Sequence, residues 1–213
     1  MIKLGLVGEG IAKSQSPDLH ERLGASLGVA VRYDLVDSLG IVDFDFPSAI
    51  QTLRAEGYRG TNVTFPFKEK AAKLADICGE GVQRVGTANT LLFDEQGLRA
   101  ENTDYTGFIS AYRHSFGSQQ AGDVLLIGAG GVGRAVACAL GELSAHCIHI
   151  LERDEQRADT LCRDLNAMGI AAECVSAKQA QRELATWQGV VNCTPIGHIN
   201  HPGCPIDTTG LGA

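Results

Sequence analysis

The sequence predicts an α/β protein with two consecutive domains, each containing a mainly parallel sheet. Short runs of β-branched and other apolar residues alternate with segments of helical periodicity along almost the whole chain. A polar and glycine-rich run, GSQQAG at 117–122, separates two such alternating halves. We place the domain boundary there, which gives domains at residues 1–117 and 118–213. The chain has 213 residues, of which 44% are hydrophobic, so both halves have enough apolar side chains for a core.

In the first half, local signals mark the beginnings of helices and the turn of a hairpin. Ser16 is expected to be the N-cap of a helix, with Pro17 at the first helical position. Two short apolar runs flank Glu95, Gln96 and Gly97, a pattern typical of a hairpin. The expected strands are 2–7, 29–36, 59–64, 88–93 and 98–101, and the expected helices are 16–27, 47–56, 66–77 and 104–116.

The second half begins with an almost entirely apolar segment, 123–127. Such a segment is typical of a strand buried in the middle of a parallel sheet. Strands and helices then alternate with short connections, as in a doubly wound domain. The expected strands are 123–127, 147–151, 172–175 and 190–193, and the expected helices are 131–143, 154–167 and 177–186.

Composition and charge exclude several classes of partner. The net charge of −7 and the isoelectric point of about 5.3 argue against a nucleic-acid binder and against a polybasic membrane anchor. The longest apolar stretch, 124–140, contains Arg134 and four glycines and does not read as a membrane span. Seven cysteines without a C-x-x-C pair indicate a reduced, cytoplasmic protein. We therefore expect a small-molecule substrate and a monomer or homodimer.

A glycine-rich segment follows the apolar strand and opens the next helix. It fits the pattern G-x-G-x-x-G and consists of Gly128, Ala129, Gly130, Gly131, Val132 and Gly133. In this context the glycines let backbone N–H groups approach a pyrophosphate at the positive end of the helix. The alternative is a tight turn of the kind found in any α/β domain. The context favours a Rossmann-like dinucleotide-binding domain.

The end of the next strand indicates which dinucleotide is bound. Glu152 lies nineteen residues beyond Gly133, where a carboxylate can accept hydrogen bonds from both ribose hydroxyls of NAD. The same charge repels the 2′-phosphate of NADP. Arg153 acts in the opposite direction, because it can contact a phosphate or stack on adenine. NAD is therefore favoured over NADP, and a solvated strand-end carboxylate is the alternative for Glu152.

Three polar segments of the first half could bind a substrate. Ser14 and Ser16 place two hydroxyls beside a helix N-terminus, where they could hold a carboxylate or simply cap the helix. Lys68 falls in the first turn of an expected helix, which suits a general acid or base as well as a solvated side chain. Asp104 begins another helix, where an N-cap is the simpler interpretation.

Together these segments resemble the shikimate dehydrogenase family, including its shikimate/quinate dehydrogenases. The resemblance rests on motifs that occur in the same order over nearly the whole chain. They are S-x-S-P at 14–17, N-V-T-x-P-x-K at 62–68, N-T at 89–90, N-T-D-x-x-G at 102–107, G-A-G-G at 128–131 and N-x-T-P-x-G at 192–197.

The resemblance implies a substrate domain followed by an NAD(P) domain, and reversible reduction of 3-dehydroshikimate to shikimate in aromatic amino acid biosynthesis or in shikimate/quinate catabolism. It implies that Lys68 moves the proton, paired with Asp104. It implies that Thr194 and Ile196 lie near the nicotinamide. The substrate-binding residues that it implies are Ser14, Ser16, Asn62, Thr64, Asn89 and Asp104.

The sequence departs from the family pattern in three respects. Lys13 stands where many family members carry His before S-x-S-P. Glu152, Arg153 and Asp154 replace the Asn-Arg-Thr of NADP-using members, which supports NAD. The family's D-x-x-Y-x-P segment and closing helix have no counterpart before Ala213, so the nucleotide domain is expected to be incomplete.

The sequence is also compatible with other functions. They are an NAD-dependent quinate/shikimate dehydrogenase, a truncated and inactive nucleotide-binding remnant, and a methylene-tetrahydrofolate type of two-domain dehydrogenase. No metal is expected, because the loop with His198, His201 and Cys204 lacks a clear fourth ligand.

Overall fold

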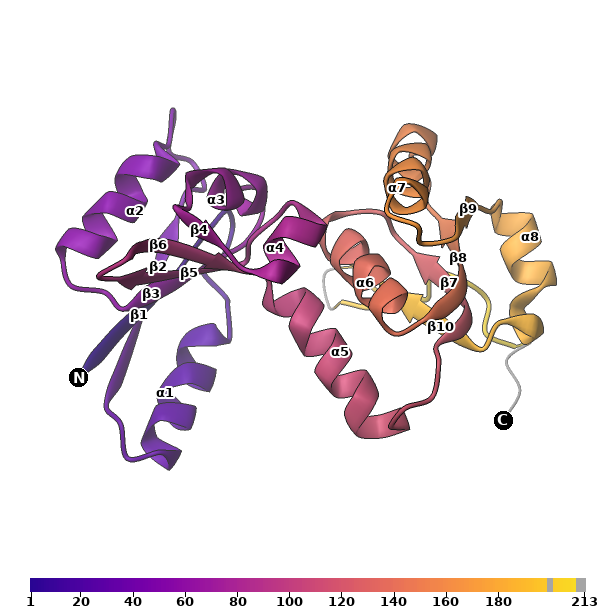
Figure 1. Ribbon diagram of the computed structural model, residues 1–213. Coiled ribbons are helices and arrows are strands. Elements are labelled where there is room, and N and C mark those ends of the chain that lie inside the picture. Colours follow the sequence, from indigo (N-terminus) through magenta and orange to yellow (C-terminus); the bar gives the residue numbers. More distant parts are fainter. Residues whose placement is uncertain (199–200, 210–213) are drawn as a thin grey trace. The chain divides into compact units, whose positions relative to one another are not determined.

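The computed structural model describes residues 1–198 and 201–209 (Figure 1). The chain divides into two compact units, Met1–Thr103 and Asp104–Ala213. Both are α/β, as the sequence predicts. The helix that follows Thr103 groups with the second unit, whereas the sequence analysis assigned it to the first domain. The division of roles between a substrate domain and a cofactor domain stays a prediction.

The first unit contains a six-stranded mixed sheet with the strand order β2-β1-β3-β5-β6-β4. Strand β5 runs antiparallel to both of its neighbours, β3 and β6, while the remaining pairs are parallel. The strands are β1 (Ile2–Gly8), β2 (Val31–Asp37), β3 (Gly60–Val63), β4 (Ile77–Cys78), β5 (Thr90–Asp94) and β6 (Gly97–Glu101). Strands β5 and β6 form the predicted hairpin.

Helices cover the two faces of this sheet unequally. The helices are α1 (Ser16–Ser26), α2 (Phe46–Ala55), α3 (Lys68–Leu74) and α4 (Glu80–Val85). The larger core lies on the face of α2 and α3, where Phe46, Phe67 and Leu91 are buried. The opposite face carries Leu6 and Tyr33 and is packed by α1 alone among the described helices of this unit (Figure 1).

Two expectations for the first unit are wrong in detail. The helix expected over 66–77 is shorter, because Asp76 accepts hydrogen bonds from the backbone of Leu98 and its own N–H bonds to the Leu98 carbonyl. The residues after Asp76 therefore form β4 against β6. Ser16 is not the N-cap of α1: Gln15 occupies that position, with no side-chain cap. The sequence analysis also missed α4.

The second unit contains a parallel sheet with the strand order β10-β7-β8-β9. Its strands are β7 (Gly122–Ile127), β8 (Ala145–Leu151), β9 (Ala172–Cys174) and β10 (Gly189–Asn192). Its helices are α5 (Thr103–Phe116), α6 (Gly131–Glu142), α7 (Glu155–Ala167), α8 (Ala177–Arg182) and the 3-10 helix η1 (Leu184–Thr186). Thr103 begins α5, one residue before the expected start.

The second sheet is covered on both faces, as expected of a doubly wound domain. One face packs Leu125 and Ile127 against Ala180 and Leu184, which belong to α8 and η1. Helices α6 and α7 contact strands β7, β8 and β9, and Ile148 and Ile150 of β8 are fully buried. The predicted order of strands and helices is thus confirmed in this unit, and the carboxyl ends of β7, β8 and β10 lie along one edge of the sheet.

Candidate functional site

A series of neighbouring polar side chains, most of them joined by hydrogen bonds, runs through the first unit, and we call it the polar relay. It begins at the turn before α1, where the Ser14 hydroxyl donates to the Ser16 hydroxyl at 3.1 Å. Ser14 Oγ also accepts the backbone N–H of Ser16 at 3.2 Å. The Ser16 hydroxyl lies close enough to the Tyr33 phenol to lower the pKa of that phenol. The two serines therefore lie beside Tyr33 of strand β2.

The relay continues across strands β3 and β5. The Tyr33 phenol donates to Asn62 Oδ1 at 2.7 Å, and Asn62 Nδ2 donates to Thr90 Oγ1 at 3.1 Å. The Thr90 hydroxyl donates to Asn89 Oδ1 at 3.0 Å. The Asn89 side chain also bonds the backbone N–H and the hydroxyl of Thr103, which fixes the residue before Asp104. The relay therefore connects four predicted substrate residues: Ser14, Ser16, Asn62 and Asn89.

Tyr33 is a central member of the relay that the sequence analysis missed. Its side chain is buried and stacks on the His20 ring at a centroid distance of 4.6 Å. Burial raises the pKa of Tyr33 to about 12, against the lowering effect of the Ser16 hydrogen bond. The phenol therefore stays protonated and remains a donor to Asn62 at neutral pH. Burial also lowers the pKa of His20, which favours its neutral form.

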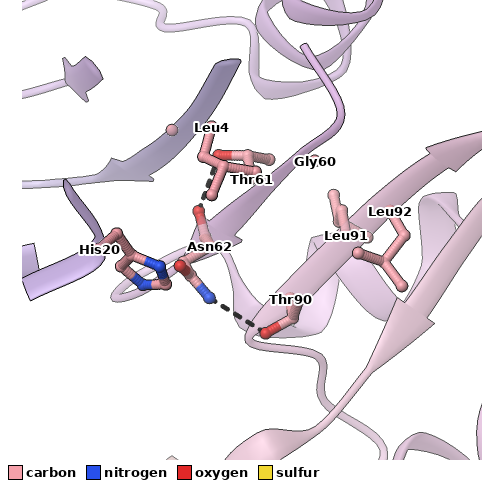
Figure 2. A pocket seen from close by; sticks show the side chains of 9 residues that line it. Leu4, His20, Gly60, Thr61, Asn62, Thr90, Leu91 and Leu92 are labelled. Carbon is pink, nitrogen blue, oxygen red and sulfur yellow. Dashed lines mark hydrogen bonds between the residues drawn. The ribbon is translucent and has the colours of Figure 1, made fainter. Parts of the chain in front are cut away.

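A pocket opens on the sheet face that carries the relay (Figure 2). Asn62 and Thr90 form one polar part of its wall, and His20 of α1 forms another. Leu4 and Leu92 contribute apolar surface. Of the predicted substrate residues, Asn62 contributes to this wall, so the pocket adjoins the relay and gives its middle members access to small molecules.

Thr64 and Lys68 lie on the segment that follows β3. The Thr64 N–H bonds to the carbonyl of Val7 at 3.0 Å, and Thr64 lies so close to Gly8 that a Cβ at that position would overlap its methyl group. Lys68 begins α3, and its carbonyl accepts the N–H of Ala88 at 2.9 Å. The lysine backbone is therefore fixed to the residue next to Asn89.

Asp104 lies in the first turn of α5 and not at its N-cap, because α5 begins at Thr103. Its negative charge acts on Cys193, directly after β10. Burial raises the pKa of the Cys193 thiol to about 11, and the Asp104 carboxylate contributes to this shift. Within the second unit, Asp104 is thus placed near the residue that precedes Thr194.

The glycine-rich turn after β7 has the geometry that its motif predicts. Gly128 adopts φ +100°, which favours glycine, and a Cβ there would lie 2.9 Å from Thr194 Cγ2. A Cβ on Gly133 would overlap the Gly128 carbonyl, so only glycine allows α6 to start this close to the turn. By contrast, a Cβ at Gly130 or Gly131 would meet nothing within 4 Å. Open space therefore lies where a bound phosphate would approach the N-terminus of α6.

Glu152, at the carboxyl end of β8, holds this turn in place by hydrogen bonds. Its Oε2 accepts the N–H of Ala129 at 2.8 Å, and its Oε1 accepts those of Arg153 at 2.7 Å and Asp154 at 3.2 Å. Partial burial works to raise the pKa of Glu152, but these hydrogen bonds outweigh it and lower the pKa below its ordinary value. The carboxylate is therefore ionised at neutral pH. Arg153 is exposed beside it.

Thr194 and Ile196 form a compact turn after β10. Asn192 Oδ1 accepts both the N–H of Thr194 at 2.9 Å and its hydroxyl at 2.7 Å. Asn192 Nδ2 donates to the carbonyl of Ile196 at 2.9 Å. Because Gly128 lies against Thr194, this turn and the glycine-rich turn are neighbours. The structure thus brings together the predicted cofactor residues of β7, β8 and β10.

The residues that the sequence analysis missed carry only weak signals in the sequence. Tyr33 has the alternating pattern of a strand, which predicts burial but no particular partner. Thr90 was noted as part of an N-T motif but was given no role. A tyrosine in the buried register of one strand, on the same sheet face as a polar residue two strands away, is the signal that could have found the relay.

Two further features concern metals and membranes. Among residues 1–198 and 201–209, no group of three or more His, Cys, Asp or Glu side chains is arranged to hold a metal ion. Ile199 and Asn200, in the loop considered for zinc, lie outside the described residues. In the same part of the chain, none of the helices has the length and apolar character needed to cross a membrane.

The glycine-rich turn, the strand-end carboxylate and the doubly wound parallel sheet define a protein with a Rossmann-type unit preceded by a separate α/β unit. Two family profiles match the chain: "Shikimate dehydrogenase substrate binding domain" over residues 6–91 and "Shikimate / quinate 5-dehydrogenase" over residues 111–197. The chain belongs to the shikimate/quinate dehydrogenase family, as the motifs indicate.

Relatives with a known name agree with this assignment. The quinate/shikimate dehydrogenase (NAD(+)) of Corynebacterium efficiens is 35% identical over 99% of this chain and 76% of its own length. The shikimate dehydrogenase (NADP(+)) of Acidiphilium cryptum is 34% identical over 95% of this chain and 70% of its own length.

Solved structures of related proteins have the same fold. Quinate dehydrogenase from Corynebacterium glutamicum in complex with NAD is 32% identical, with a TM-score of 0.89 over 99% of this chain and 76% of that one. Shikimate 5-dehydrogenase from Thermus thermophilus in complex with NADP(H) and shikimate is 31% identical, with a TM-score of 0.80 over 99% and 75%. The chain thus matches about three quarters of each of these proteins.

The role of Tyr33 in the relay can be tested by removing one oxygen atom. In Tyr33→Phe, Asn62 Oδ1 loses its phenolic donor in a partly buried site, so we expect the free energy of unfolding to fall by about 1–2 kcal/mol. Urea denaturation measures this change. Tyr112→Phe is the matched control, because that phenol donates to a backbone carbonyl at an exposed position. Equal effects of the two substitutions would contradict the role of Tyr33.

The glycines of the glycine-rich turn differ in the space available for a side chain. Gly133→Ala places a methyl group on the Gly128 carbonyl, and we expect the thermal midpoint to fall by several degrees. Gly130→Ala adds a methyl group in open space, and we expect the midpoint to stay within about 2 °C. Thermal denaturation followed by circular dichroism compares the two variants. A larger loss in Gly130→Ala than in Gly133→Ala would show that the turn is packed differently.

Proposed function

We propose that this protein is an NAD(P)-dependent oxidoreductase that catalyses the reversible reduction of 3-dehydroshikimate to shikimate, with NAD as the favoured cofactor. One observation carries the proposal: four residues named by the family motifs, Ser14, Ser16, Asn62 and Asn89, are members of the polar relay in the first unit. Membership of the family supports the reaction class. We also propose a cytoplasmic location and a monomeric or homodimeric state.

The relay suits a substrate that carries a carboxylate and several hydroxyls. We propose that the Ser14 and Ser16 hydroxyls, which can rotate to donate outward, bind the carboxylate. Asn62, Thr64 and Asn89 are then the groups for ring hydroxyls, because amides and hydroxyls both donate and accept. Tyr33 positions Ser16 and Asn62 and does not itself need to touch the substrate.

The protein's own chemistry in this proposal is proton transfer. The nicotinamide, when bound, supplies or accepts the hydride. Reduction of a ring carbonyl leaves negative charge on its oxygen, which needs a proton donor within about 3 Å. We propose Lys68 as that donor, and as the acceptor in the reverse direction. We propose Asp104 as the second catalytic residue, which accepts a hydrogen bond from a substrate hydroxyl. The pairing of Lys68 with Asp104 stays a prediction.

The second unit supports the choice of cofactor. We propose that the pyrophosphate lies at the glycine-rich turn, that Glu152 accepts the ribose hydroxyls, and that Thr194 and Ile196 lie at the nicotinamide end. Glu152 keeps acceptor capacity beyond the three N–H groups it already binds, because a carboxylate offers about four lone-pair sites. Its ionised state disfavours a 2′-phosphate. Arg153 favours NADP instead, because its guanidinium group can contact a phosphate.

A second candidate is an NAD-dependent quinate/shikimate dehydrogenase. The same carboxylate favours it, and two relatives that bear this name, from Corynebacterium efficiens and Corynebacterium glutamicum, are 35% and 34% identical to this chain. A nucleotide-binding protein without dehydrogenase activity is the remaining alternative. These candidates differ in the substrates that they oxidise, so one set of assays separates them.

The decisive experiment follows absorbance at 340 nm with shikimate or quinate as substrate and NAD⁺ or NADP⁺ as cofactor. We expect oxidation of shikimate, faster with NAD⁺. In Lys68→Ala, loss of the proton acceptor is expected to lower kcat at least about 100-fold with little change in substrate binding. Lys73→Ala is the control, because Lys73 is an exposed residue of the same helix.

The outcomes distinguish the candidates. Faster oxidation of quinate than of shikimate would favour the second candidate. NAD binding without oxidation of either compound would favour the nucleotide-binding alternative. A Lys68→Ala variant with near-wild-type kcat would remove Lys68 from the catalytic step.

Glu152 can be tested separately from the catalytic residues. In Glu152→Gln the charge is removed while an acceptor oxygen for the Ala129 N–H remains, so repulsion of a 2′-phosphate should weaken. We expect the ratio of kcat/KM for NADP⁺ to that for NAD⁺ to rise by about tenfold. Glu155→Gln, which removes an exposed charge from the first turn of α7, is the control. An unchanged ratio in Glu152→Gln would show that Glu152 does not select the cofactor.

A further inference from the structure

Two of the seven cysteines meet in the second unit, and a third lies on an adjacent strand. Cys162 lies on α7, Cys174 is the last residue of β9, and Cys147 lies on the neighbouring strand β8. The sulfur atoms of Cys162 and Cys174 are 2.8 Å apart. Both are free thiols in this structure, and they differ in accessibility: Cys162 is buried and Cys174 is exposed.

The local fold holds these two thiols in place. Asn166 lies one turn after Cys162, and its Nδ2 donates to the carbonyls of Cys162 at 2.9 Å and Ala172 at 2.8 Å. Asn166 Oδ1 accepts the N–H of Ala172 at 3.2 Å. The Asn166 side chain therefore links the start of β9 to α7. This brings the end of β9 against α7, where the two thiols meet.

The surroundings give the two thiols different chemistry. Burial raises the pKa of Cys162 to about 12, with further contributions from Cys174 and Asp159. The Cys174 thiol donates to Asp159 Oδ1 at 3.6 Å and is accessible to solvent. Cys174 is therefore the sulfur that a soluble oxidant reaches first, and Cys162 is the partner held directly behind it.

We propose that Cys162 and Cys174 form a reversible thiol–disulfide pair, a covalent redox site that links α7 to strand β9. The oxidant is a low-molecular-weight disulfide, R–S–S–R. Cys174 loses its proton and attacks one sulfur of the oxidant, which releases one R–S⁻ and leaves a mixed disulfide. Cys162 then loses its proton and attacks the Cys174 sulfur, which releases the second R–S⁻. Two protein thiols are oxidised, and one R–S–S–R is reduced to two R–SH after protonation.

The charges around Cys174 favour one kind of oxidant. Asp159 accepts a hydrogen bond from its thiol, and Glu173 is the preceding residue in the chain. Both side chains are carboxylic acids. We therefore expect a cationic disulfide, such as cystamine, to react faster than the anionic disulfide of glutathione, and the difference to shrink at high ionic strength.

The cross-link would stabilise the edge of the sheet. Strand β9 has three residues and lies at the end of the strand order β10-β7-β8-β9. A disulfide between positions 162 and 174 closes a short loop and restricts the unfolded chain, so we expect the thermal midpoint to rise by about 5 °C. Glu152 and the glycine-rich turn lie outside this loop.

The experiment uses the full chain treated with cystamine, quenched with acid and digested with trypsin after the remaining thiols are blocked in denaturant. Cleavage after Arg163 separates the two cysteines into peptides 158–163 and 164–178. We expect a cross-linked species of these two peptides that disappears on reduction. Cys174→Ser, a substitution at an exposed position, should abolish it, and Cys147→Ser should retain it as the neighbouring control.

Three results would overturn the proposal. One is a mixed disulfide that stays on Cys174 while Cys162 remains a free thiol. Another is a cross-link from Cys174 to peptide 135–153, which contains Cys147, in place of peptide 158–163. The third is loss of the cross-linked species in Cys147→Ser. Equal rates with cystamine and oxidised glutathione would overturn the part assigned to Asp159 and Glu173.

Discussion

The polar relay of the first unit depends on the register of four neighbouring strands. Leu4 is paired with Tyr33, Leu6 with Asn62, and Asn62 with Thr90. Paired residues of adjacent strands point to the same face of a sheet, so Tyr33, Asn62 and Thr90 share the α1 face. A slip by one residue would turn Asn62 toward the apolar core on the opposite face. The apolar pattern of the strands thus also fixes the positions of the polar groups on the α1 face.

In the second unit, a charged side chain that follows a strand has a comparable positioning role. Strands β7 and β8 are parallel, so the turns that follow them emerge at one edge of the sheet. Glu152 follows β8, and its carboxylate binds the N–H of Ala129 in the turn that follows β7. Asn192 plays a similar part after β10 by holding Thr194. In both units, side chains at strand ends shape the loops that the family motifs occupy.

Much of this architecture could be predicted from the sequence, because it follows from local signals. Alternation, glycines and N-cap residues located most of the strands and helices, and Asp154 caps α7 where a helix was expected. The segment after Leu74 could not be predicted in this way. Its conformation is decided by Asp76, which bonds to Leu98 more than twenty residues away. The same reason explains why Tyr33 was missed: its partners lie on other strands and before α1, and a linear pattern does not specify them.

Glu152 holds the glycine-rich turn, and this limits which substitutions could alter its proposed role in cofactor choice. Its folded-state pKa is lowered, so the stability that it contributes is present above its ordinary pKa of 4.5 and is lost as the pH falls through the lower folded value. The same hydrogen bonds that lower the pKa hold the glycine-rich turn in place. A substitution that removes the charge therefore also removes part of the support of the turn. A change in preference from NAD toward NADP would consequently require a residue that replaces the acceptor for Ala129 while it tolerates a phosphate. Glutamine meets the first condition, and the exposed Arg153 is the adjacent residue.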